Sequence, residues 1–151
     1  MATNILYVTP QQNTAQAGVQ GNPFRPYTLT AALEVLRRSN QPLIFWLSEG
    51  TYQLCGAATT ITGQVSIYGA SIKNTILVMT GVSIPVGSFV ALYNLTLTSC
   101  PGTSVLLDIA GNLAINASMV SSNRGKFLNM RRGLLTLTNC NVELLNAFAM
   151  Y

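Results

Sequence analysis

Few side chains in this chain of 151 residues can do acid–base or metal chemistry. There is no histidine, and the only acidic residues are Glu34, Glu49, Asp108 and Glu143. Without imidazole there is no histidine base and no histidine ligand for a metal ion. Four widely spaced carboxylates also suit neither a calcium cage nor the paired acids of a glycosidase. We therefore expect no catalytic residues, no cofactor-binding residues and no metal ligands, and the protein is predicted not to be an enzyme.

The cysteines Cys55, Cys100 and Cys140 match neither a zinc-binding pattern nor a disulfide framework. Cys100 and Cys140 end two similar segments, residues 95–100 and 135–140, which the repeat described below places two coils apart. Coils spaced by about 4.8 Å would separate these cysteines by roughly 9.6 Å. A disulfide needs Cα atoms within about 7 Å. The sequence thus predicts reduced thiols at Cys100 and Cys140, as in a cytosol-like compartment, and assigns no place to Cys55.

Positive charge gathers in one short segment. Four basic residues lie within nine positions, namely Arg124, Lys126, Arg131 and Arg132, in a chain whose net charge is only +4. They could contact phosphate or an acidic partner surface, although a solvated turn is the simpler interpretation.

The overall composition predicts a surface with little charge. Hydrophobic residues make up 49% of the chain and charged residues 8%, so Ser, Thr, Asn, Gln and Gly must form most of the exposed surface. The N-terminus lacks the basic start and apolar segment of a signal peptide, and the longest apolar run, residues 43–47, is too short to span a bilayer. We expect a soluble protein with no membrane partner.

One helix and many short strands follow from the local patterns. Residues 29–38 are predicted to be helical, with Thr30 as the N-cap and an apolar stripe that includes Leu33. Residues 43–47 predict a buried strand, and alternating segments separated by Gly, Asn, Ser or Pro continue from residue 51. The expected organisation is a single domain over residues 1–151. Residues 1–42 form its N-terminal strand and capping helix, and residues 43–151 form its coils.

An internal repeat carries the prediction of fold. Four segments each end in an aliphatic–small–aliphatic pattern, at Val65/Ile67, Leu95/Leu97, Leu113/Ile115 and Leu135/Leu137. The spacing from one segment to the next is uneven, with the widest step between the first two. Alternation within a segment and a period of roughly 20 residues between segments indicate one coil per repeat, with inward aliphatic side chains stacked on one another.

These segments together resemble the right-handed parallel β-helix of the pectate-lyase-like superfamily. The most specific parts are residues 5–10, Asn22-Pro-Phe24 leading into the helix, the strand at Ile44, the turn at residues 49–52 and residues 64–69. The resemblance implies an all-β protein, a short single-stranded right-handed parallel β-helix of about five coils with an N-terminal capping α-helix. It says almost nothing about function.

The expected register argues against two kinds of site. Asp108 is the only acid between residues 51 and 142, and its predicted neighbours in adjacent coils are Val90 and Met130, so no acidic ladder is expected. Tyr68 and Tyr93 are assigned different repeat positions, so no aromatic ladder for sugar binding is expected.

Ice binding is also disfavoured. The Thr-x-Thr segments at residues 96–98 and 136–138 would need a continuous threonine ladder between them. Ala114 and Asn116 interrupt it in the expected register.

The low charge and stacked core are similar to those of viral structural proteins. The first hypothesis is a non-enzymatic structural protein of a virus particle: a minor capsid, cementing or spike/fibre component located in the virion and assembled in the host cytoplasm or nucleus. Its expected partners are itself, as a homotrimer, and other virion proteins, with no nucleic acid. The alternative is a tailspike-like β-helix that binds or cleaves carbohydrate, with a glycan as partner.

The contacts expected in such an assembly are the basic cluster and the uncharged tail after Glu143, whose apolar side chains need cover. The candidate residues are Arg124, Lys126, Arg131, Arg132, Phe148, Met150 and Tyr151.

Overall fold

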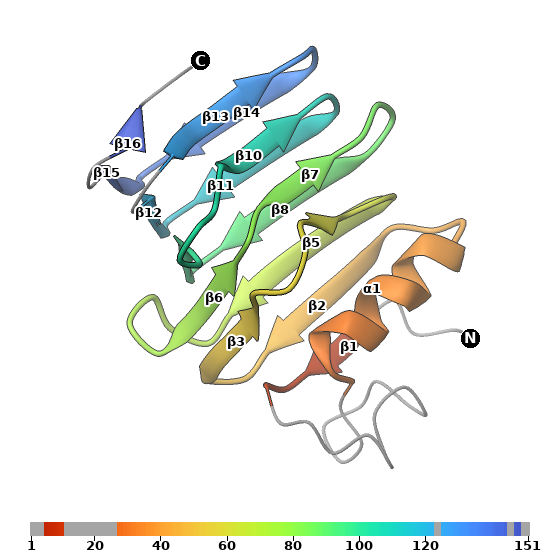
Figure 1. Ribbon diagram of the computed structural model, residues 1–151. Coiled ribbons are helices and arrows are strands. Elements are labelled where there is room, and N and C mark those ends of the chain that lie inside the picture. The colour runs from red at the N-terminus through yellow and green to blue at the C-terminus, as the bar shows by residue number, and fades with distance from the viewer. Residues whose placement is uncertain (1–4, 11–26, 123–124, 145–146, 149–151) are drawn as a thin grey trace.

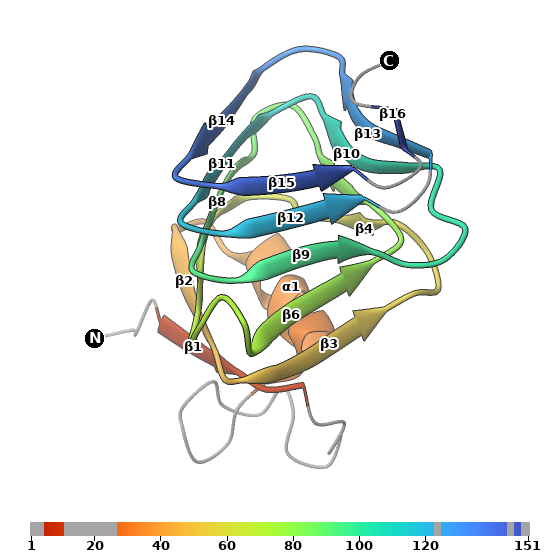
Figure 2. The same cartoon turned by 90° about the vertical axis from the view of Figure 1, so that its left-hand side faces the viewer.

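Three parallel sheets wind around one apolar core in the computed structural model, which describes residues 5–10, 27–122, 125–144 and 147–148 (Figures 1 and 2). Sheet 1 contains β1 (Ile5–Val8), β2 (Leu43–Leu47), β5 (Gln64–Gly69), β8 (Phe89–Tyr93), β11 (Asn112–Asn116) and β14 (Leu134–Thr138). Sheet 2 contains β3 (Gly50–Leu54), β6 (Thr75–Met79), β9 (Thr96–Ser99), β12 (Met119–Ser122) and β15 (Asn141–Leu144). Sheet 3 contains β4 (Thr59–Thr60), β7 (Val82–Ile84), β10 (Val105–Ile109), β13 (Gly125–Met130) and β16 (Ala147–Phe148).

The chain visits the three sheets in the same order on every turn, which makes the fold a parallel β-solenoid. Four turns separate β2 from β14, and β15 and β16 continue beyond them. The predicted all-β fold with an N-terminal helix is confirmed, with about four turns where about five coils were expected. Each position in sheet 1 recurs once per turn, as the row Leu43, Val65, Val90, Leu113 and Leu135 shows, and the turns differ slightly in length.

Inward side chains form continuous rows along the solenoid axis. In sheet 1, Phe45, Ile67, Leu92 and Ile115 lie in register on successive strands, and all four are buried. Sheet 2 adds Leu77 and sheet 3 adds Ile84 and further aliphatic residues to the same core. This stacking is possible because the side chains of a strand alternate between its two faces.

The helix α1 (Leu29–Arg38) lies at the N-terminal end of the solenoid, beside β1 and β2 (Figure 1). Its residues Leu29, Ala32 and Leu36 are buried against the first turn. The predicted helix span is confirmed, but the N-cap is Thr28 rather than Thr30. The Thr28 hydroxyl accepts a hydrogen bond from the Ala31 N–H at 3.2 Å, because Thr28 is the last extended residue before the helix.

On the last three described turns, the corner between sheet 1 and sheet 2 contains a non-glycine residue with positive φ. Asn94, Ala117 and Asn139 occupy it on three successive turns, with φ of 59°, 48° and 53°. Asparagine tolerates this left-handed conformation better than other L-residues. Ala117 therefore holds the same corner at a conformational cost.

The expected repeat alignment was wrong in its second segment. Val90 and Leu92, not Leu95 and Leu97, pair with the β5 residues Val65 and Ile67. Leu95 and Leu97 follow the corner into sheet 2. Sheets 1 and 2 both carry an aliphatic–small–aliphatic pattern, so the pattern alone does not distinguish neighbouring strands of one turn.

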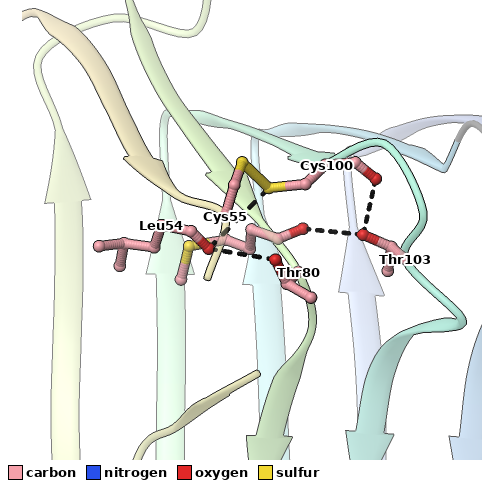
Figure 3. The surroundings of a disulfide bond; sticks show 6 residues. Leu54, Cys55, Thr80, Cys100 and Thr103 are labelled. Atoms are coloured by element: carbon pink, nitrogen blue, oxygen red, sulfur yellow. Dashed lines mark hydrogen bonds between the residues drawn. A yellow bond between two sulfur atoms is a disulfide. The ribbon is translucent and has the colours of Figure 1, made fainter. Parts of the chain in front are cut away.

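A disulfide joins Cys55 and Cys100, so the expectation that Cys100 is reduced was wrong (Figure 3). The two residues follow β3 and β9, with β6 between them, yet their Cα atoms are 5.7 Å apart. The spacing of ladder strands does not apply here because both cysteines lie in turns beyond the strand ends. Thr103 supports the turn, since its hydroxyl donates to the Cys100 carbonyl at 2.7 Å. Cys140 is a half-buried free thiol.

Candidate functional site

The outward face of sheet 1 spans six strands, and its described strand positions carry no charge. The outward positions of its described strands alternate with the inward rows and include no Asp, Glu, Lys or Arg. They are Ile5, Tyr7, Ile44, Trp46, Gln64, Ser66, Tyr68, Phe89, Ala91, Tyr93, Asn112, Ala114, Asn116, Leu134, Thr136 and Thr138. We call this surface the sheet 1 face.

An aromatic ladder crosses three strands of the sheet 1 face. The rings of Trp46 and Tyr68 stack with centroids 5.0 Å apart, and those of Tyr68 and Tyr93 with centroids 4.5 Å apart. The prediction that Tyr68 and Tyr93 occupy different positions was wrong, because their strands pair with the tyrosines in register. A usable signal was present: an aliphatic or aromatic inward residue followed by an outward aromatic ring recurs at residues 45–46, 67–68 and 92–93.

The ladder rings turn their flat faces toward one another. The planes of Tyr68 and Tyr93 differ by only 8°, so stacking occupies the faces between them and leaves their edges for a partner. Trp46, at one end of the ladder, is 43% exposed.

A second exposed ring, Phe89, lies on the same face. Phe89 begins β8, where Tyr93 ends it, and is 48% exposed. Between them Ala91 is only 3% exposed although it points outward. The ladder and Phe89 thus flank a row of small side chains.

Asp108, the acid in β10, forms a salt bridge with Arg131. Asp108 lies in register with Ser83 and Asn129, so the expected neighbours Val90 and Met130 were wrong. Both carboxylate oxygens of Asp108 accept hydrogen bonds from the Arg131 guanidinium, at 3.1 Å each.

The wrong neighbour Val90 followed from the misaligned second repeat segment, and the wrong neighbour Met130 has a separate geometric cause. Two residues separate β10 from β11, whereas three separate β13 from β14. The number of residues between paired positions therefore differs between sheet 1 and sheet 3. One fixed number of residues per turn cannot assign the register of both sheets.

The predicted contact residues are only partly brought together. Arg131 is bound to Asp108, Arg132 is exposed in the corner that follows β13, and Lys126 is half-buried near the start of β13. The structure therefore separates the basic residues into different surroundings. Arg124, Met150 and Tyr151 lie outside the described residues, and nothing is described of the Phe148 side chain.

Apolar side chains are partly exposed beside β14, the last described strand of sheet 1. Leu137 continues the inward row of Phe45, Ile67, Leu92 and Ile115, but it is 41% exposed where Ile115 is 0% exposed. Met130 continues the inward row of Ile109 in the same way and is 38% exposed. Among the described residues no strand pairs with the outer edge of β14. Within the described residues, the apolar core is thus partly exposed beside β14, at a surface that we call the open end.

A cavity of about 650 Å³ lies between the N-terminal end of α1 and β3. The Tyr52 hydroxyl on its wall shares its one proton between the carbonyls of Val8 and Ser48, at 3.0 and 2.8 Å. Burial raises the pKa of Tyr52 to about 12 despite the Ser48 hydrogen bonds, so the phenol is neutral at ordinary pH. Of the described residues that line this cavity, Glu34 is the only acid, so no second carboxylate is present there for paired acid–base chemistry.

Two other expected features can be placed. The threonine pairs at residues 96–98 and 136–138 lie on different sheets, in β9 and β14, so they cannot form one ice-binding lattice. Within the described residues, no three His, Cys, Asp or Glu side chains gather where they could hold a metal ion.

Comparisons with protein-family models, curated proteins and solved structures gave no match to this chain. In the part of the chain that the structure describes, no helix has the length and apolar character needed to cross a membrane.

Proposed function

We propose that this chain is a non-enzymatic structural protein of a virus particle, a pectate-lyase-like β-helix that assembles with copies of itself and with other particle proteins. The observation that carries the proposal is the uncharged sheet 1 face. A surface with no charges can be covered by a partner without the desolvation cost of burying ions.

The residues around Asp108 support a non-enzymatic role. Asp108 is paired with Arg131 in a bidentate arrangement that satisfies both of its oxygens. A glycosidase site would need a second carboxylate close by. The residues in register with Asp108 on the neighbouring strands are Ser83 and Asn129, and neither is an acid.

The disulfide is compatible with a particle exposed to oxidising surroundings. Disulfides such as Cys55–Cys100 persist in secreted proteins and on virion surfaces, and they are rare in a reducing cytosol. This supports a mature location on the particle, with assembly in the host cell preceding or accompanying oxidation.

The aromatic ladder favours a second candidate, a carbohydrate-binding β-helix. Tyrosine and tryptophan on an uncharged face suit neutral sugars, which bind aromatic surfaces and hydroxyl groups. The stacked arrangement weakens this candidate, because pyranose rings need an open aromatic face and the faces between ladder rings are occupied. The end rings Trp46 and Tyr93 each have one face outside the stacked pairs, and Trp46, the more exposed at 43%, would carry most of such binding.

The native mass tests the first candidate. Light scattering after gel filtration at 0.15 M and 1 M NaCl should give a stable oligomer at both salt concentrations, because the contacts are uncharged. Phe89→Arg should disrupt an assembly that uses the sheet 1 face, and Gln53→Arg on the outward side of sheet 2 is the matched control. A monomer at 100 µM in both salts would contradict the assembly proposal.

Affinity electrophoresis in neutral polysaccharides tests the second candidate. Retardation that Trp46→Ala abolishes and Phe89→Ala preserves would favour sugar binding over assembly. Release of reducing ends from the polysaccharide would contradict the non-enzymatic role.

A further inference from the structure

We infer that the Cys55–Cys100 disulfide is a redox switch. Thiol reductants open it in the folded protein, and its reduction frees residues 55–60, which comprise the connection after β3 and the strand β4. The later turns of the solenoid keep their structure. This inference goes beyond the proposed function, because it concerns a single chain and holds whatever that chain assembles with.

The disulfide joins the first turn of the solenoid to the third. The strands β3, β6 and β9 are consecutive in sheet 2, and Cys55, Thr80 and Cys100 directly follow their ends. Figure 3 shows the bridge together with Thr80, so the bond passes over one whole turn. The chain has three cysteines and Cys140 is free, so no second disulfide restrains the first turn.

The connection from β3 to β4 has few other contacts. Residues 55–58 are exposed, and no hydrogen bond in the described part of the chain involves residues 56–58. A Cβ atom added to Gly56 would meet nothing within 4 Å. A cavity of about 260 Å³ lies between this connection and the α1 residues Leu33 and Arg37, so α1 packs only loosely against it. The disulfide therefore fixes the path of the connection.

The strand β4 is weakly held as well. It has two residues and is the edge strand of sheet 3, where β7 is its only partner among the described strands. The N–H groups of Thr59 and Ile61 donate to the carbonyls of Gly81 and Ser83, at 2.8 and 2.9 Å. A short edge strand opens at a lower free energy than the strands inside a sheet. Once Cys55 is released, the connection and β4 can therefore separate from β7 together.

A reductant can approach the disulfide from the Cys55 side. Cys55 is exposed, whereas Cys100 is only 3% exposed. A thiolate of a dithiol attacks the Cys55 Sγ, the S–S bond breaks, and the electron pair leaves on the Cys100 Sγ, which takes a proton from water. The second thiol of the reductant then loses its proton and displaces the Cys55 thiolate, which is protonated in turn. Two protein thiols form, and the dithiol is oxidised to its own disulfide.

The later turns do not depend on this bond. In a solenoid each turn contacts chiefly its neighbours, and β11 and β12 lie after Cys100, outside the loop that the disulfide closes. Their inward residues Leu113, Ile115 and Val120 are buried. Reduction therefore acts on the first turn, where the release of β4 leaves the outer edge of β7 without its partner.

Amide exchange of residues 1–151 tests the inference, with Cys140→Ser to remove the thiol that could attack the disulfide. Reduction with dithiothreitol should speed exchange at Thr59 and Ile61 by about tenfold or more, with little dependence on urea. The Ala110 amide donates to the Ile84 carbonyl on the other side of β7, and its exchange should keep the urea dependence of global unfolding. Equal acceleration with equal urea dependence at all three amides would overturn the inference.

Elastase probes the same connection independently, because it cleaves after small residues such as the exposed Ala57 and Ala58. Cleavage between residues 56 and 60 should be about tenfold or more faster after reduction, since a protease acts on the locally opened chain. The control is Cys55→Ser with Cys100→Ser, which should be cut at the reduced rate with or without dithiothreitol. A cleavage rate that reduction leaves unchanged in the Cys140→Ser protein would contradict the switch.

The accessibility of the bond is measured by alkylating the new thiols and determining the mass of the protein. Dithiothreitol without urea should reduce the bond while circular dichroism still reports a folded solenoid. Reduction that requires urea would mean that the bond opens only on global unfolding, which overturns the inference. None of these measurements involves association, so a monomer that contradicts the proposed assembly leaves the switch unaffected.

Discussion

The rings of Tyr68 and Tyr93 stack with centroids 4.5 Å apart and planes within 8°, although a whole turn of the chain separates them. The pair exists because β5 and β8 are consecutive strands of sheet 1 and place both side chains on its outward side in the same row. The same relationship joins Trp46 to Tyr68. These contacts link the first three turns on the outside, as the inward aliphatic rows do on the inside.

The stacking energy of the ladder can be measured. A double-mutant cycle with Tyr68→Leu and Tyr93→Leu should give a coupling energy of about 0.5–1.5 kcal/mol, the usual range for an aromatic pair. Urea unfolding of the four proteins supplies the free energies. Trp46→Leu with Tyr93→Leu is the control cycle, because those rings are separated by Tyr68, and its coupling should be smaller.

The Cys55–Cys100 disulfide should stabilise the fold chiefly through the unfolded chain. The two residues are 45 positions apart, and closing a loop of that length is worth about 4 kcal/mol in the chain-entropy description. Cys55→Ser with Cys100→Ser should therefore lower the free energy of unfolding by about 2–5 kcal/mol. Reduction of the wild-type protein should lower the free energy of unfolding by a similar amount. In the Cys140→Ser control, reduction should lower it by as much as in wild type, because Cys140 is not in the disulfide.

Tyr52 should make the stability depend on alkaline pH. Its pKa in the fold is about 12, against 10.0 for an ordinary tyrosine, so the folded protein favours the neutral phenol. Its contribution is complete below pH 10 and is lost as the pH rises from 10 toward 12, where the unfolded state loses the proton first.

The matching variant is Tyr52→Phe. It should cost about 1–2 kcal/mol at pH 7, because the carbonyls of Val8 and Ser48 lose their donor. Its stability should also fall less steeply with pH above 10 than that of wild type in urea unfolding. Parallel curves for the two proteins would rule out the assigned role of Tyr52.

Ala117→Asn should stabilise the protein by about 0.5–1 kcal/mol. Ala117 has φ of 48° in the corner where Asn94 and Asn139 stand on the neighbouring turns, and an exposed alanine loses no packing on replacement. Ala117→Val should instead destabilise it, because a β-branched residue fits positive φ poorly. Thermal unfolding of the three proteins measures the order, and an unchanged midpoint in Ala117→Asn would contradict the conformational argument.

Truncating a side chain in the inward row of sheet 1 should cost less unfolding free energy at Leu137 than at Ile115. Ile115→Ala should cost about 2–5 kcal/mol, since Ile115 is fully buried. Leu137→Ala, one turn further in the same row, should cost about 1 kcal/mol or less in the monomer because Leu137 is already 41% exposed. Equal losses would mean that another part of the chain covers the open end.

The sequence by itself determined the period, the helix and the kind of fold. Residues 29–38 carry an amphipathic pattern that is satisfied locally, and the spacing of Leu113 and Leu135 corresponds to one true turn of the solenoid. The scarcity of acids and the absence of histidine are likewise properties of composition. Such features survive an error of register because they depend on composition, on near neighbours or on a single repeat.

Only the tertiary structure decided which residues share a row. Corners of the solenoid differ in length, so the step from Tyr68 to Tyr93 is longer than the step from Asp108 to Asn129. An alignment error of one residue moves every side chain of a strand to the opposite face. Because adjacent sheets carry similar aliphatic patterns, the sequence does not reveal such an error. The disulfide depends on turns that leave the ladder spacing altogether, so Cys55 and Cys100 could be joined only once the path of those turns was known.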